Sequence, residues 1–229
     1  MVKHLAIQMD GNRRWARKQG LMAFYGHGEG VKTIERVIDF CIANSIVHLS
    51  LYTLSLENLK RAPEELQYLL DLLVNEGKKQ LIQAIEKGAR IRFIGDRTKF
   101  PERSRAAIEE IEQKTLGGTK LQVNLLFCYG GQQEIVQATK SLIAKVQAGA
   151  LQLEQLNEQL FQEHLWTAGI PAPDLYIKTG GRQRLSNFLL YQSAYSELYF
   201  LDCLWPELQA QHLDQAVVYY NTCQRNFGA

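Results

Sequence analysis

The sequence predicts one α/β domain that spans residues 1–229, with a central, mostly parallel sheet flanked by helices. Two observations support this class. Short apolar runs typical of buried strands alternate with longer segments whose apolar residues recur at helical spacing. No repeat, low-complexity tract or interdomain linker divides the chain, whose 229 residues suit one sizeable domain. Helices of this length between strands favour βαβ units and therefore parallel pairing.

Six apolar runs are predicted to form the strands. Each is short, and polar or turn-forming residues follow most of them, as expected where a buried strand ends. The expected strands are His4–Met9, Val47–Leu54, Arg90–Ile94, Leu121–Phe127, Leu175–Ile177 and Leu198–Leu201.

Helical patterns occupy most of the segments between these runs. The first begins with Arg13, Arg14 and Trp15. Pro63 and Pro101 each open a later helix, because proline suits the first helical turn. The remaining expected helices rest on apolar residues at helical spacing, in 31–42, in the long region after Pro63 up to 85, in 135–146 and near 209–221.

Composition excludes several classes of protein. The chain is 46% hydrophobic and 22% charged, and its net charge of +2 is too small to indicate nucleic-acid binding by itself. Its four cysteines form no CxxC pair and are expected to be reduced, buried thiols. No signal peptide is visible, and no apolar run approaches the ~18 residues of a membrane span. We therefore expect a cytoplasmic protein, which could still touch a membrane surface.

Polar segments follow four of the predicted strands. Ligands of parallel sheets bind beyond the carboxyl ends of the strands, so these segments are expected to meet at one edge. They are Asp10–Asn12, Ser55–Arg61, Tyr129–Gly131 and Thr179–Arg184.

Asp10 is the most informative of these residues. It ends the first strand and precedes a Gly11-Asn12 turn, after which Arg13 and Arg14 begin a helix. A carboxylate there can hold a divalent cation, while helix-start amides and guanidinium groups can hold phosphate oxygens. Asp10 could instead be only a helix N-cap, but a cap does not need cationic neighbours. The segment indicates an enzyme that acts on a diphosphate.

Three further features could serve either in substrate binding or only in the structure. The Gly26–Gly30 segment could cradle an anion or be a flexible loop before a helix, and its His27 could be a satisfied structural histidine. Ser55 and Asn58 could be helix-start hydrogen bonders. Arg61 could be a solvated surface charge. The residues alone leave these alternatives open.

The segment from Lys178 to Phe188 gives a stronger signal. Its three cations surround a Gly-Gly turn, and an apolar helix start is expected directly after Ser-Asn. This pattern predicts a diphosphate-binding nest, and a plain basic surface loop fits the apolar continuation poorly. Farther along, Glu197 lies inside an aromatic and apolar run. A buried, unpaired glutamate is costly, so we expect a metal or an arginine beside it.

These segments, in this order, resemble the cis-prenyltransferase family, most closely its undecaprenyl diphosphate synthase branch. The likeness runs nearly end to end. Its motifs lie at residues 4–16, 26–31, 51–61, 173–190 and 194–206. Five long motifs in sequence make a chance match negligible.

The resemblance implies the reaction and the partners. An allylic diphosphate, farnesyl diphosphate by expectation, would react with isopentenyl diphosphate to form a Z double bond and a polyprenyl diphosphate. Undecaprenyl diphosphate, the cell-wall lipid carrier, is the expected product, and a hydrophobic cleft would hold the growing prenyl chain. The family uses Mg²⁺ and is homodimeric, and Arg225–Gly228 resembles its C-terminal motif near the subunit contact. No nucleic acid is implied.

The resemblance also implies the site residues. Asp10 and Asn58 would be catalytic, and Asp10 and Glu197 would bind the metal. An amide is too weak a base to remove a proton alone, so we give Asn58 an orienting role with the departing diphosphate as the base. The substrate-binding residues would be Gly11, Asn12, Arg13, Arg14, Trp15, His27, Ser55, Leu56, Glu57, Leu59, Arg61, Lys178, Arg184, Leu185 and Ser186.

Alternatives to this function come from three classes. The first is a paralogue that makes a shorter or irregular prenyl diphosphate, and the second is a non-catalytic partner subunit. Such a partner would be expected to lose the metal carboxylate, whereas this chain keeps Asp10, Glu197 and Arg184. A phosphatase of the HAD type is weaker still, because no second aspartate lies two residues after Asp10.

Several positions depart from the family pattern. Ala23 replaces an arginine that helps to bind the allylic diphosphate, and Lys178 replaces another arginine. Conversely, Arg13 replaces a glycine and Arg182 an acidic residue. We hypothesise that positive charge has been relocated around the same site. Leucines also stand where larger aromatic residues are usual, at Leu54 and Leu59, which leaves product length and primer open.

Overall fold

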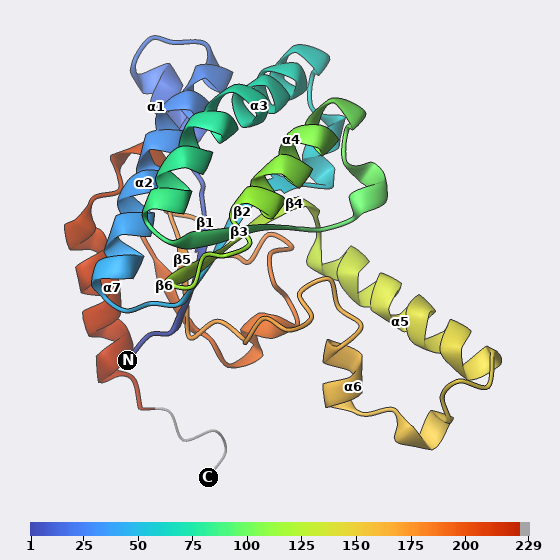
Figure 1. The fold of residues 1–229 in the computed structure, drawn as a ribbon. Helices are drawn as coiled ribbons and strands as arrows, with labels where there is room; N and C mark the ends of the chain where they lie inside the picture. The colour runs from blue at the N-terminus through green and yellow to red at the C-terminus, as the bar shows by residue number, and fades with distance from the viewer. Residues whose placement is uncertain (225–229) are drawn as a thin grey trace.

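The computed structural model describes residues 1–224, except for the side chains of residues 77–81, and contains the six expected strands in one sheet (Figure 1). The strand order is β3-β4-β2-β1-β5-β6, and every pairing between them is parallel. The predicted parallel sheet is confirmed. The strands are β1 His4–Gln8, β2 His48–Ser55, β3 Ala89–Ile94, β4 Leu121–Tyr129, β5 Leu175–Lys178 and β6 Glu197–Phe200.

The helices also follow the predicted pattern. Pro63 is the first residue of α3, whose first turn carries Glu64 and Glu65 toward the positive end of the helix dipole. Pro101 is the N-cap of α4 rather than its first residue. The helices are α1 Asn12–Lys18, α2 Gly26–Ala43, α3 Pro63–Glu86, α4 Glu102–Lys114, α5 Gly131–Gln147, α6 Glu158–Gln162 and α7 Ala210–Thr222.

The register of the central strands aligns their carboxyl ends. In β1, Gln8 pairs with Lys178 at the end of β5, and in β2 Ser55 pairs with Tyr129 at the end of β4. The segments that follow these strands therefore leave the sheet at one edge, as predicted. A shift of register between Tyr52 and Ser55 bends the end of β2.

Two hydrophobic cores lie on opposite faces of the sheet. Alternate residues of β1 divide between them: Leu5 and Ile7 enter the larger core, and Ala6 enters the smaller one. Helices α2, α3, α4 and α7 cover the larger core (Figure 1). Residues from the irregular chain between α6 and β6 cover the smaller core, among them Trp166 and Phe188.

The helix expected directly after Asn187 does not form. Ser186, Asn187 and Leu189 have φ values of 48°, 67° and 48°, in the left-handed region that a right-handed helix excludes. The chain makes turns there, and only a short 3₁₀ helix, Gln192–Tyr195, follows. This prediction was wrong because apolar residues that cover a sheet face need no helical backbone.

The cysteine and membrane expectations are tested in part. Cys41 and Cys128 are buried, whereas Cys203 and Cys223 are only partly buried, and all four are free thiols. Within the described part of the chain, the helices are too short or too polar to cross a bilayer.

Candidate active site

A cavity of about 380 Å³ begins at the carboxyl edge of β1 and β2 and extends beneath α2 and α3. Its polar lining includes Asp10, Asn12, His27, Asn58 and Arg61. The deeper walls are apolar and come from both helices and from the sheet: Ile34, Ile38, Leu69, Leu72, Leu73, Ile91, Phe93, Val123 and Leu125. The predicted hydrophobic cleft is therefore present, with polar residues at one end.

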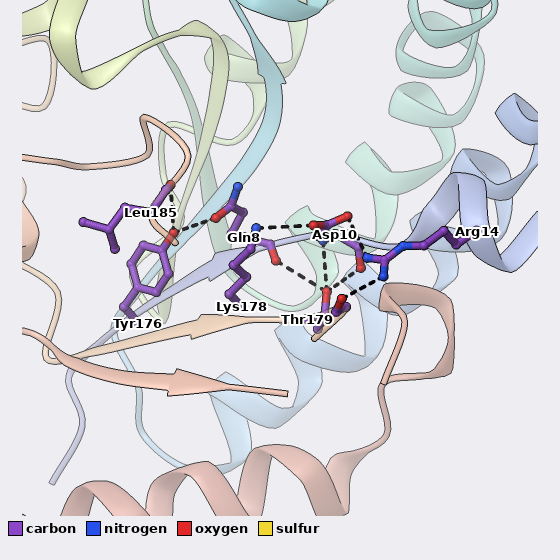
Figure 2. Close-up of polar contacts among 8 residues, drawn as sticks. Gln8, Asp10, Arg14, Tyr176, Lys178, Thr179 and Leu185 are labelled. Carbon is purple, nitrogen blue, oxygen red and sulfur yellow. Dashed lines mark hydrogen bonds and ion pairs between the residues drawn. The ribbon is translucent and has the colours of Figure 1, made fainter. Parts of the chain in front are cut away.

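The backbone around Asp10 is held by Thr179. The Asp10 amide donates to Thr179 Oγ1 at 3.0 Å, and that hydroxyl donates to the Asp10 carbonyl oxygen at 2.7 Å (Figure 2). The N-cap of α1 is Gly11, with φ 116° and no side-chain cap. Asp10 is therefore not a helix cap, and the structural alternative for this residue is excluded.

Two cations flank the Asp10 carboxylate. Lys178 Nζ lies 3.4 Å from Oδ2, and Arg14 Nη2 lies 3.2 Å from Oδ1 (Figure 2). Arg14 also donates to the Gly180 carbonyl oxygen at 2.8 Å. The Lys178 side chain is only 1% exposed. Burial lowers the pKa of Lys178, and Arg184 and Arg14 add to this, whereas Asp10 raises it.

A second cavity, of about 320 Å³, adjoins the first and is strongly cationic. Arg13, Arg14, Arg17 and Arg61 line it together with His27. The two cavities share the lining residues Met9, Asp10, Asn12, His27 and Arg61. Arg17 was not among the predicted residues, although its spacing from Arg13 and Arg14 on one helix was the available signal.

The two arginines of the charge-relocation hypothesis lie in different surroundings. Arg13 lines the cationic cavity, as this hypothesis requires. Arg182 is exposed and lines neither cavity. The geometry therefore supports the hypothesis for Arg13 alone.

Glu65 anchors the cations of this cavity, and the sequence analysis missed it. Its buried carboxylate accepts a hydrogen bond from Arg61 at 3.0 Å and lies 3.8 Å from both Arg13 Nη2 and His27 Nε2. The spacing of four residues after Arg61, at a proline-led helix start, was the available signal. Arg61 is thus an anchored cation and not a freely solvated charge.

His27 belongs to α2 itself, so the alternative of a flexible loop at residues 26–30 is excluded. The first residue of α2 is Gly26, where a side chain does not fit because a Cβ would lie 2.0 Å from the Asn12 carbonyl oxygen. His27 Nε2 is buried without a hydrogen-bond partner. Burial, then Arg61 and Arg13, lower the pKa of His27 to about 4, so the imidazole is neutral at pH 7.

This neutral histidine predicts a pH dependence of stability. The unfolded chain takes up the proton near pH 6.5 and the folded protein only near pH 4, so stability is complete above pH 6.5 and falls toward pH 4. The shift corresponds to about 3 kcal/mol. Urea unfolding measures the free energy of unfolding at pH 7 and at pH 4. Between these two pH values, the wild type should lose about 3 kcal/mol more than His27→Gln does. Equal losses in the two proteins would contradict the prediction.

Ser55 and Asn58 are helix-start hydrogen bonders, as the structural alternative stated. The Asn58 amide donates to Ser55 Oγ at 3.1 Å, and the Ser55 amide donates to Asn58 Oδ1 at 3.4 Å. Both residues also line the larger cavity, so the two interpretations are compatible. Leu56 and Leu59 pack against the larger core.

The predicted diphosphate nest at Gly180 and Gly181 lacks free amides. The Gly180 amide donates to the Cys203 carbonyl oxygen and the Gly181 amide to the Leu201 carbonyl oxygen, both at 2.8 Å. Glycine is instead favoured at position 180 by its left-handed φ of 86°, and a Cβ there would also displace the Arg14 guanidinium, whose Nη2 would lie 2.3 Å away. Anion binding in this segment is left to side chains. Ser186 lines the larger cavity, Arg184 is exposed, and Trp15 and Leu185 line neither cavity.

Within one chain, Glu197 does not join Asp10 in a metal site. It begins β6 and pairs with Leu175, which pairs with Leu5 near the start of β1. Asp10 follows the other end of β1. The two carboxylates therefore lie toward opposite ends of the parallel strands. Glu197 is also only partly buried, because β6 is an edge strand, so the premise of a buried glutamate was wrong.

The remaining donors fit a magnesium ion that is bound together with phosphate. In the described residues, no three His, Cys, Asp or Glu side chains gather to hold a metal. Mg²⁺, however, is usually held by one or two carboxylates and substrate phosphates. Asp10 would supply the carboxylate, and Asn12 lines both cavities with it, although its Oδ1 is buried beside Gly30.

The fold and the site together define a prenyltransferase enzyme, in which a cationic cavity for an anion opens into an apolar cavity at the edge of a parallel sheet. The family model described as "Putative undecaprenyl diphosphate synthase" matches residues 8–228. The chain belongs to this family.

Similar proteins agree with this assignment. An isoprenyl transferase from Clostridium perfringens is 42% identical, over 100% of this chain and 90% of that protein. The farnesyl-diphosphate-specific ditrans,polycis-undecaprenyl-diphosphate synthase of Escherichia coli is 40% identical, over 99% and 89%. The crystal structure of lavandulyl diphosphate synthase from Lavandula x intermedia, in complex with dimethylallyl diphosphate, matches with a TM-score of 0.96 at 31% identity, over 100% of this chain and 98% of that one.

Proposed function

We propose that this enzyme condenses isopentenyl diphosphate onto farnesyl diphosphate, with Z double-bond formation, and extends the product to undecaprenyl diphosphate. The observation that carries the proposal is the junction of the two cavities at Asp10, which joins a cationic site to a long apolar one. The name of the Escherichia coli relative supports the choice of primer and product.

The allylic half of the reaction uses the cationic cavity. Arg13, Arg14 and Arg61 bind the allylic diphosphate, and neutral His27 donates or accepts one hydrogen bond. The prenyl tail enters the apolar cavity. Asp10 and Asn12 are suited to hold Mg²⁺, which when bound neutralises charge on the leaving diphosphate.

The second half of the site binds isopentenyl diphosphate beside the allylic diphosphate. Lys178, Arg184 and Ser186 bind its diphosphate, and Ser55 and Asn58 orient it from the end of β2. The isopentenyl double bond attacks the allylic carbon as the bond to diphosphate breaks. A proton then leaves the isopentenyl unit for the departing diphosphate, which restores a double bond and balances charge.

One assay tests this function. Radiolabelled isopentenyl diphosphate is incubated with dimethylallyl, geranyl or farnesyl diphosphate, with and without Mg²⁺, and products are separated by chain length. We expect a long product, with farnesyl diphosphate and Mg²⁺ required. A short or branched product would favour the irregular alternative. Absence of any product would favour a partner subunit.

The second copy of a homodimer has a candidate surface on α5. This helix and α6 project from the body of the protein (Figure 1). Val136 and Ile143, one heptad apart on α5, are 52% and 51% exposed, and Leu153 follows at 63%. The family's C-terminal motif at 225–228 lies outside the described residues. Sedimentation should show a wild-type dimer that Val136→Asp weakens, and a wild-type monomer would refute the proposal.

We also propose that the protein is cytoplasmic and contacts a membrane surface. Leu21, Met22 and Tyr25 are 46%, 60% and 46% exposed between α1 and α2, beside the exposed cations Arg17 and Lys18. Apolar side chains beside cations favour an anionic lipid surface. Flotation with phosphatidylglycerol vesicles should recover the wild type and much less of a Met22→Ser variant. Equal recovery of both would refute the contact.

A further inference from the structure

Asn187 connects three segments that come from distant parts of the chain. The amide of Gln132 donates to its side-chain Oδ1, and the amide of Gly131 donates to its carbonyl oxygen, both at 2.8 Å. Its Nδ2 donates to Glu57 Oε1 at 2.8 Å and to Gln133 Oε1 at 3.0 Å. Asn187 therefore ties the segment that follows β5 to the start of α5 and to the 3₁₀ helix Glu57–Lys60.

The backbone at this position is specialised. Ser186 and Asn187 are consecutive left-handed residues, and asparagine tolerates that conformation better than most residues do. The segment is fixed on its other side by Tyr176, whose hydroxyl donates to the Leu185 carbonyl oxygen at 3.2 Å (Figure 2). Gly130 leaves room for the side chain, because a Cβ there would lie 2.8 Å from Asn187 Nδ2.

Asn187 and its partner Glu57 each adjoin a residue that lines the larger cavity. Ser186 precedes Asn187 in the chain, and Asn58 follows Glu57. Both Ser186 and Asn58 line that cavity, from segments 130 residues apart in the sequence. The hydrogen bond between Asn187 Nδ2 and Glu57 Oε1 joins the two segments directly, and the Tyr52 ring of β2 stacks on Phe188 beside it.

We propose that Asn187 is a positioning residue that aligns Ser186 with Asn58 around isopentenyl diphosphate. The inference rests on the proposed function and names a residue for the isopentenyl half of the site. The allylic half is held separately, because Arg61 is anchored by Glu65 and Arg14 by Asp10 and Gly180. The loss of Asn187 should therefore weaken one substrate selectively.

The Glu57 carboxylate is held in its ionised form, in which it accepts hydrogen bonds. Burial raises the pKa of Glu57, but hydrogen bonds from its own amide, Ser55, Asn187 and Gln133 outweigh this and lower it. The carboxylate therefore stays ionised and accepts from Asn187 throughout the neutral range.

The test compares substrate binding and turnover in matched variants. Asn187→Gly keeps the left-handed backbone available and removes only the side chain. We expect the Kd and KM for isopentenyl diphosphate to rise about tenfold, with the KM for farnesyl diphosphate within twofold of the wild type. Glu57→Ala should reproduce this selective loss. Glu57→Gln keeps an acceptor oxygen and should bind isopentenyl diphosphate several-fold more tightly than Glu57→Ala does.

Ser45→Gly is the matched control, because Ser45 is also left-handed, with φ 56°, and lies outside both cavities. It should leave both KM values unchanged. Unchanged isopentenyl binding in a folded Asn187→Gly protein, or equal losses for both substrates, would overturn the inference. Calorimetric binding of isopentenyl diphosphate needs no turnover. A wild type that binds but forms no product would therefore count against the proposed function and leave the inference decided by the Kd values.

Discussion

Replacing Asp10 by Asn is expected to lower kcat about a thousandfold at saturating substrate and Mg²⁺. The Asp10 carboxylate is the group that we propose to hold Mg²⁺, and its loss would remove several kcal/mol of transition-state stabilisation, where about 1.4 kcal/mol corresponds to tenfold in rate. Steady-state kinetics over a range of Mg²⁺ concentrations measure the effect. An unchanged kcat would show that Asp10 does not bind the catalytic metal.

The same substitution should also lower stability, for a separate reason. Lys178 is buried beside Asp10, and neutralising that carboxylate leaves the ammonium near Arg14 with no compensating charge. Asp10 is 34% exposed, so we expect a loss of only about 1–2 kcal/mol. The double variant Asp10→Asn/Lys178→Met should recover the Tm and not the activity, which separates the two roles.

Replacing Arg61 by Met should raise the KM for the allylic diphosphate about 10- to 100-fold, the range for loss of a hydrogen bond to a charged group. Arg61 lines both cavities and is held in place by Glu65, so its guanidinium is already ordered before substrate binds. Lys145→Met removes an exposed cation at the end of α5 and serves as the control.

A second readout of Arg61→Met needs no substrate. Arg61 is one of the two cations that lower the pKa of His27, so the variant should titrate His27 at a pH above about 4. NMR titration of the imidazole measures the change. An unchanged KM together with an unchanged His27 pKa would place Arg61 outside the cationic cavity in solution.

Much of the fold was predictable because its signals are local. Apolar runs bounded by polar residues located all six strands to within a few residues, and Pro63 located the start of α3. The position of Asp10 at a strand end also led us to predict an anion and metal site, which stays a prediction. The helix expected after Asn187 failed because apolar content was taken as evidence of helical backbone.

Residues of the site were predictable where they follow a strand or begin a helix, even when they lie in different segments. Arg13, Arg14 and His27 line the cationic cavity as expected. Glu65 lies four residues after Arg61, but that spacing does not show that Arg13 and His27 also approach its carboxylate. Glu197 was placed with Asp10 by resemblance, although the strand register puts the two toward opposite ends of the parallel strands within one chain.

The amino-acid sequence alone was enough to predict the α/β class and the order of the strands and main helices, and it indicated which chemistry to expect at the end of β1. These follow from periodicity and from residue types at strand ends, which act over short distances along the chain. Three features became visible only in the folded chain: the Gly180 and Gly181 amides bond to backbone carbonyl oxygens, Glu65 anchors Arg61, and Asn187 bonds to Glu57. The cavities and the bonds between distant segments depend on packing across the sheet, and packing is a property of the folded chain that no single segment encodes.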